Sequence, residues 1–184
     1  AEYSTWGAWA MGSPDISPNA GDQNAAVHLG FWVAGEVLDQ SDIPTSGSAS
    51  MTGRAVFNVA YRYNQANSDY GVTQYSTDAD VSASFNWGSG SYSGQLDFAN
   101  FDSGNSLVSN AGFTSFSVSL AGTGATYAGS LNDTNNGWTR EAVIAGALYG
   151  NNTPVESGGR ISVGLSKSGS LGTSILCSPF ICST

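Results

Sequence analysis

The sequence predicts an all-β protein built as a single antiparallel up-and-down β-barrel of about eight strands, with a two-sheet β-sandwich as the alternative. Apolar and polar residues alternate with a period of two in segment after segment, and the helical period of 3.6 is almost absent. Only 10 % of the 184 residues are charged, whereas long exposed helices are rich in Glu and Lys. Glycines at inward positions of several segments suit a strongly curved sheet, which favours the barrel.

The first predicted strands lie in the amino-terminal third of the chain, at residues 6–11, 27–33 and 51–63. The first of them is mostly apolar and contains two tryptophans. The other two have an apolar residue or a glycine at every second position, so each has one face suited to a core.

The later predicted strands lie at residues 79–87, 92–98, 116–120, 127–131, 142–148 and 161–165. In residues 79–87, for example, every odd position is apolar and every even position is polar. Gly88-Ser89-Gly90 and Ala121-Gly122-Thr123-Gly124 supply the positive φ angles that tight hairpin turns need. The alternation gives about eight to ten strands in all, and no loop between them looks like an interdomain linker.

We expect one barrel domain, residues 1–166, followed by a C-terminal tail, residues 167–184. The tail carries an apolar run and two cysteines, Cys177 and Cys182, whose spacing matches no common zinc or redox motif. A local disulfide between them is therefore expected, and with it an oxidising compartment. The first residue, Ala1, indicates a chain matured by export, so we expect a secreted protein or one on a bacterial cell surface.

The charge balance excludes several classes of partner. Five basic and 14 acidic residues give a net charge of −9. A field of this sign repels phosphate backbones and anionic lipid headgroups, so nucleic acids and membrane surfaces are not expected partners. No run of 18 apolar residues occurs, so no helix is expected to span a membrane.

Motifs for catalysis and metal binding are weak. The sole histidine, His28, lies on the face of its predicted strand opposite the apolar set, where an ordinary surface or packed histidine is expected. No Gly-x-Ser-x-Gly elbow is present. Asp78 and Asp80 share one strand face, but such pairs are usually solvated, and no Asp-x-Asp-x-Asp-Gly loop supports calcium. The sequence therefore predicts no enzyme, no metal and no cofactor.

Aromatic residues and the tail indicate an interface instead. Five Trp and eight Tyr are more than one barrel interior can hold, and exposed Trp and Tyr are common at protein interfaces and also stack on sugars. Packing beneath loops is the alternative for these rings. For the tail, docking on a neighbouring subunit and strapping its own barrel are equally favoured. The candidate interface residues are Trp9, Trp32, Trp138, Leu171, Ile175, Leu176, Phe180 and Ile181.

An ordered set of short motifs resembles the β-barrel domain of transferrin-binding protein B and its bacterial relatives, over about residues 3–166. The motifs are Trp6-Gly7-Ala8-Trp9, Val33-Ala34-Gly35, the run 43–53 from Ile-Pro-Thr-Ser-Gly to Met-Thr-Gly, Gly94 within 92–96, Gly146-Ala147-Leu148-Tyr149-Gly150 and Glu156-Ser157-Gly158-Gly159. The resemblance implies an eight-stranded antiparallel barrel, export from a Gram-negative bacterium, and protein or haem-protein binding without catalysis.

Three functions follow as hypotheses. The first is a non-catalytic structural subunit of an extracellular or cell-surface assembly, a homo-oligomer that associates through exposed aromatics and the C-terminal tail. The alternative, which the resemblance favours, is a receptor for an iron or haem carrier protein. The third is a carbohydrate-binding module.

Overall fold

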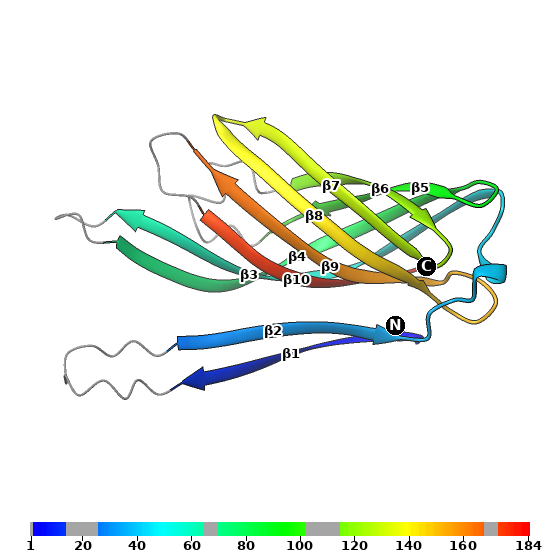
Figure 1. Ribbon diagram of the computed structural model, residues 1–184, viewed down its shortest axis with the longest axis horizontal. Coiled ribbons are helices and arrows are strands. Elements are labelled where there is room, and N and C mark those ends of the chain that lie inside the picture. The colour runs from blue at the N-terminus through cyan, green and yellow to red at the C-terminus, as the bar shows by residue number, and fades with distance from the viewer. Residues whose placement is uncertain (1, 14–25, 65–69, 102–114, 168–172) are drawn as a thin grey trace.

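The computed structural model describes residues 2–13, 26–64, 70–101, 115–167 and 173–184, which form ten strands and one short 3-10 helix. Eight strands close an antiparallel barrel in which neighbours along the chain are also neighbours in the sheet (Figure 1). This confirms the predicted all-β, up-and-down barrel of eight strands. The strands are β3 (Gly47–Asn64), β4 (Tyr70–Trp87), β5 (Tyr92–Ala99), β6 (Ser115–Thr123), β7 (Thr126–Asn135), β8 (Trp138–Tyr149), β9 (Glu156–Ser166) and β10 (Thr173–Ser183).

The first two strands stay outside the barrel. β1 (Ser4–Ser13) and β2 (Ala26–Gly35) pair with each other as a separate two-stranded antiparallel sheet. Figure 1 shows this hairpin lying alongside the barrel wall. After the hairpin, the chain passes through the helical turn η1 (Gln40–Asp42) and enters the barrel at β3. Both segments were predicted to belong to the barrel domain. The sequence could not separate them from it, because alternation shows that a strand has two unlike faces but not which sheet the strand joins.

Burial follows the alternation closely in the barrel strands. In β6, Phe116, Val118 and Leu120 are buried while the serines between them are exposed. The β7–β8 turn has Asn136 and Gly137 at φ 51° and 76°, the two left-handed residues that a type I′ hairpin turn needs. Local sequence thus specifies both the faces of these strands and the tight connection between them.

Aromatic side chains fill much of the barrel interior. Phe57 is completely buried, and its ring centroid lies 4.9 Å from that of Phe101 and 5.8 Å from that of Phe98. Phe98 stacks on Phe116 at 4.8 Å, and Phe85 stacks on Trp87 at 5.5 Å. The inside of the barrel is therefore a packed core, as expected for a closed sheet of eight strands.

The C-terminal segment closes the barrel instead of extending from it. β10 pairs with β3 on one side and with β9 on the other, and Phe180 within it is completely buried in the core. Residues 167–184 were predicted as a tail beyond a barrel of residues 1–166, either strapping that barrel or docking on a neighbour; most of this segment is instead a strand of the barrel itself. Without β10, both β3 and β9 would present an unpaired edge, which is the physical reason for its place in the sheet.

The predicted disulfide between Cys177 and Cys182 is wrong. Cys182 is a free, buried thiol, and burial raises its pKa to about 12. Both cysteines lie in β10, where five residues of extended chain span about 16 Å. A disulfide needs Cα atoms roughly 4.4–6.8 Å apart, so residues at this spacing in one strand cannot reach each other. Without this disulfide, the cysteines no longer indicate an oxidising compartment.

Candidate functional site

The β1–β2 hairpin carries most of the large exposed apolar side chains found in the described part of the chain. Trp6, Trp9 and Trp32 are 41 %, 51 % and 44 % exposed, and Val37 follows directly after the hairpin at 49 %. On the barrel wall, Val143 of β8 is the corresponding exposed residue. Exposed indoles on a single small sheet are unusual for a soluble surface and mark a candidate contact area.

The strand register divides these tryptophans between two faces. Gly7 lies opposite Trp32 and Trp9 lies opposite Gly30, so Trp9 and Trp32 are diagonal neighbours on one face. The Trp32 ring lies across Gly7, where an added Cβ atom would be only 2.5 Å from it. Trp6 lies on the other face, opposite Val33. We call the face with Trp9 and Trp32 the outer face of the hairpin.

The inner face of the hairpin rests on the outer wall of the barrel. Val33 sits over Gly158 of β9, where a Cβ atom would be 3.2 Å from the valine methyl carbon Cγ1. Ile181 points out of the barrel at the same place, next to Gly158 in the register, and is nevertheless buried. The missing side chain at Gly158 is what lets the two sheets approach here.

A buried carboxylate fastens the base of the hairpin to the barrel. Glu156, at the start of β9, accepts hydrogen bonds from the Ser4 hydroxyl at 2.5 Å, the Tyr3 backbone N–H at 3.1 Å and the Glu2 backbone N–H. Burial alone would raise the pKa of Glu156, but these hydrogen bonds outweigh it and hold the pKa below its ordinary value. Glu156 is therefore an ionised anchor at neutral pH.

The chain leaving β2 provides a second attachment. The Glu36 N–H donates to the Tyr3 carbonyl at 2.9 Å, and the Gly150 N–H donates to the Glu36 carbonyl at 3.2 Å. Val37 forms an isolated antiparallel bridge with Tyr149 at the end of β8. The hairpin is thus held firmly at its base, while its distal half extends beside the barrel wall (Figure 1).

The part of the sequence that contains this hairpin is acidic. Residues 1–53 contain no lysine or arginine, and their acidic residues are Glu2, Asp15, Asp22, Glu36, Asp39 and Asp42. Among them, Glu2, Glu36 and Asp39 are exposed near the base of the hairpin. A partner that docks on the outer face therefore meets aromatic rings, with exposed carboxylates toward the base of the hairpin.

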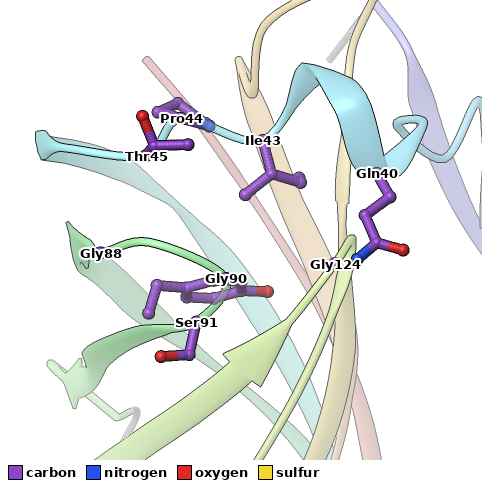
Figure 2. Close-up of a pocket in the computed structure, with 9 residues that line it drawn as sticks. Gln40, Ile43, Pro44, Thr45, Gly88, Gly90, Ser91 and Gly124 are labelled. Carbon is purple, nitrogen blue, oxygen red and sulfur yellow. The ribbon is translucent and has the colours of Figure 1, made fainter.

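A small pocket lies at the same end of the barrel, under η1. Figure 2 shows Gln40 and Ile43 facing the turns that contain Gly90 and Gly124 across it, and its volume is about 100 Å³. No charged side chain lines the pocket. It is too small for a drug-sized or cofactor ligand, which typically needs roughly 300–1,000 Å³.

Asp78 and Asp80, the two carboxylates on one strand face, both form ion pairs with Arg54. Arg54 contacts both Asp78 and Asp80, the latter at 2.8 Å, and the Asn100 amide donates to Asp80 at 2.7 Å. His28 lies on β2 opposite Met11, and its side chain is outside the described residues. In the described part of the chain, no group of three or more His, Cys, Asp or Glu could hold a metal ion, and no helix is long and apolar enough to cross a membrane.

The structure separates the predicted interface residues into three groups. Trp9 and Trp32 are exposed on the outer face of the hairpin. Trp138, Phe180 and Ile181 are buried, which removes them from a candidate surface. Ile175 and Leu176 have their backbone in β10 but their side chains lie outside the described residues, and Leu171 lies wholly outside them.

Two important features were not predicted from the sequence. Trp6 and the anchor Glu156 both belong to motifs on which the family resemblance rests. The distance between these two motifs in the sequence gives no sign that Glu156 would hold the hairpin that contains Trp6 against the barrel. The signal that could have found Glu156 is its position as an acid within a run of small residues, where a buried carboxylate needs donors from elsewhere.

Comparison with solved structures shows a similarity in fold. All of this chain matches 33 % of a double mutant of the vaccine antigen transferrin-binding protein B from Haemophilus parasuis Hp5, with a TM-score of 0.51 and 20 % identity. The chain is similar in fold to transferrin-binding protein B. A single mutant of that protein matches 98 % of the chain over 33 % of its own length, with a TM-score of 0.51 and 18 % identity.

The resemblance inferred from the sequence motifs is thus confirmed at the level of fold. This chain spans about a third of the length of the transferrin-binding protein B structures that it matches. No protein-family model matches the sequence, and no curated protein matches it either.

Proposed function

We propose that this chain is a non-catalytic protein-binding module of a bacterial surface protein, and that the outer face of the β1–β2 hairpin contacts the partner. Its fold is that of a domain of transferrin-binding protein B, a protein whose name states that it binds another protein. The receptor hypothesis is therefore better supported than the structural-subunit hypothesis.

The observation that carries the proposal is the pairing of Trp9 with Trp32 on one exposed face. Tryptophan is enriched among the residues that dominate binding energy at protein interfaces. The Trp32 ring is already laid across Gly7, so little conformational entropy remains to be lost when a partner covers it.

The charge around the hairpin selects the kind of partner surface. With no lysine or arginine in the first 53 residues, the outer face is suited to a basic patch, in which arginine or lysine stacks on the indoles and pairs with Glu36 or Asp39. An iron-carrier protein of the transferrin class is the first partner to test, by analogy with the matched structures.

The structural-subunit hypothesis has lost its main support. It depended on an apolar tail free to dock on a neighbour, and β10 uses that segment to close its own barrel. Self-association through the hairpin tryptophans stays a prediction.

Binding measured by biolayer interferometry against transferrins, haemoglobin and a glycan panel tests the proposal. We expect a transferrin, or another protein that carries a basic surface patch, to bind, and the double substitution Trp9→Ser with Trp32→Ser to weaken that binding by at least about 100-fold. Val143→Ser, which removes an exposed apolar residue from the barrel wall, is the matched control and should leave binding unchanged.

Two results would count against this function. Tight binding to a glycan, abolished by the same double substitution, would favour the carbohydrate-binding module. Equal loss of protein binding in the Val143→Ser control would move the contact from the hairpin to the barrel wall.

A further inference from the structure

A groove of about 440 Å³ lies between the hairpin and the barrel wall, and Trp32 borders both this groove and the outer face. Tyr149, one of its lining residues, forms the isolated bridge with Val37 at the base of the hairpin, and Figure 1 shows the barrel strands β8 and β9 sloping away from β2 beyond that base. Its volume is typical of a ligand-binding site. The groove is lined by Phe31, Trp32, Val33, Ala145, Gly146, Ala147, Tyr149, Gly158, Gly159 and Arg160.

The β2 side of the groove is a strand edge. Three consecutive β2 residues, Phe31 to Val33, line it. Successive side chains of a strand point to opposite faces, so three in a row border a groove only where the edge of the strand is turned toward it. Within the described residues β2 pairs with β1 alone. This edge therefore presents unpaired backbone N–H and C=O groups, which are a template for another strand.

The barrel side of the groove is a floor of small residues. Ala145 and Ala147 project outward from β8, and Gly158 of the neighbouring β9 has no side chain. This leaves depth for a chain to lie next to β2 without a clash. Arg160, opposite Ala145 and four residues along β9 from the anchor Glu156, is exposed and makes no ion pair within the described part of the chain.

We propose that this groove binds an extended peptide segment of another protein, which adds to β2 as a third antiparallel or parallel strand and places an acidic side chain against Arg160. The free edge supplies the backbone hydrogen bonds and the alanine floor accepts small apolar side chains at alternate positions. Arg160 is the cation at the groove in a chain of net charge −9, so an acidic residue fits here and nowhere else along the groove.

A partner segment fits this edge better than a second copy of the chain does. Two copies, each with a net charge of −9, repel each other as they approach, and the hairpin itself adds acidic residues at the contact. The site also differs from the outer face, which offers indole rings and carboxylates to a basic surface. Trp32 belongs to both surfaces, so Trp9→Ser tests the outer face alone and Ala145→Trp tests the groove alone.

The test uses two synthetic eight-residue peptides in which valine alternates with serine, one with a single glutamate and one with a single lysine in its place. Binding to the full chain is measured by fluorescence anisotropy, and backbone protection by amide hydrogen exchange. We expect the glutamate peptide to bind at least tenfold more tightly than the lysine peptide and to slow exchange of those amides among residues 31–33 that point away from β1. Protection of these amides shows strand pairing, which side-chain docking alone would not produce.

Two variants locate the peptide. Ala145→Trp fills the floor of the groove and Arg160→Glu reverses the charge beside that floor, and each should weaken binding of the glutamate peptide at least tenfold. Ser84→Trp, at an exposed position of β4 on the opposite side of the barrel from β8, is the control for an added indole and should not change it. Arg160→Glu should also shift the preference to the lysine peptide.

Three outcomes would overturn the proposal. One is no binding of either peptide at millimolar concentration. Another is binding that Ala145→Trp leaves unchanged. The third is exchange protection of β2 that rises with protein concentration in the absence of peptide, because this would assign the edge to a second copy of the chain.

Discussion

The barrel and the hairpin use the same strand pattern for opposite purposes. In the barrel, alternation buries one face around the Phe57, Phe85 and Phe98 side chains, and every strand has two neighbours. In the hairpin, the two strands have only each other, and three tryptophans remain partly exposed. An isolated two-stranded hairpin is marginally stable, so this one depends on its attachment at Glu156 and Glu36.

This difference separates stability from binding. The closed barrel can keep its fold when surface groups change, since its free energy comes from the core and from a sheet without free edges. The hairpin contributes little to that core but presents both candidate binding surfaces, the outer face and the groove. Substitutions should therefore divide into those that unfold the barrel and those that only alter the hairpin.

The largest expected effect is in the barrel core. Phe57→Ala removes a completely buried ring that contacts Phe98, Phe101 and Phe116, and should lower the free energy of unfolding by about 3–5 kcal/mol. The measurement is urea denaturation followed by circular dichroism. Trp9→Ala, in the hairpin, should cost about 1 kcal/mol or less. Similar losses in both variants would contradict the division of roles.

The next effect compares two glycines of one barrel strand. A Cβ atom at Gly159 would lie 2.4 Å from the Ala145 carbonyl oxygen, whereas at Gly164 it would meet nothing within 4 Å. We expect Gly159→Ala to destabilise the barrel by about 1–3 kcal/mol. Gly164→Ala should be neutral or stabilise it by up to about 1 kcal/mol. Thermal melting of the two variants measures the difference, and the reverse order would show that the wall is not closely packed at Gly159.

Removing the charge of the anchor should loosen the hairpin and leave the barrel intact. Glu156→Gln replaces a carboxylate that accepts three hydrogen bonds, at a local cost of about 1–3 kcal/mol. Amide exchange in β1 and β2 should accelerate while exchange in the barrel strands stays slow. Glu141→Gln, at an exposed position of β8, is the control.

The same anchor gives the hairpin an acid dependence. Because the folded pKa of Glu156 is lowered, its contribution is complete above the ordinary value of 4.5 and is lost as the pH falls through the lower folded pKa. Wild-type exchange in the hairpin should therefore approach that of Glu156→Gln only in acid. A difference between the two proteins that is greatest in acid would contradict this assignment.

The smallest expected effect is a loss of barrel stability at alkaline pH. The pKa of the Cys182 thiol rises from 9.0 to about 12 on folding, so its contribution is complete below pH 9 and is lost as the pH rises toward 12. At pH 10 the loss should be about 1 kcal/mol. Cys182→Ala should remove this part of the decline in melting temperature, while ionisation of the buried Tyr127, whose pKa burial also raises, remains in both proteins.

Much of the barrel could be predicted from the sequence because most of its strands show a clear alternation of apolar and polar residues. Residues 79–87 and 116–120 show their buried faces in the alternation itself, and the glycine turns mark the hairpins between strands. The candidate site was predicted only in part. Trp9 and Trp32 could be identified as candidate surface residues, but Trp138, which has the same composition signal, is buried with Lys167 5.8 Å from its ring.

Other errors had one cause, which is that long-range pairing leaves no local pattern. The segment around Phe180 reads as an apolar tail, and only its pairing with both β3 and β9 makes it the closing strand. Cys177 and Cys182 are close in sequence, yet the extended backbone of β10 holds them apart.

By itself, the sequence determined the all-β class and most of the strands, the inward and outward faces of those strands and the acidic character of the amino-terminal region. These properties depend on residues that are close together in the sequence, so local composition and the two-residue alternation of apolar and polar residues show them directly. Only the tertiary structure decided which strands enter the barrel, that Glu156 anchors the hairpin, and that a free edge of β2 faces a groove. Those depend on contacts between residues more than 100 positions apart, such as Ser4 and Glu156, whose free energy no local pattern encodes.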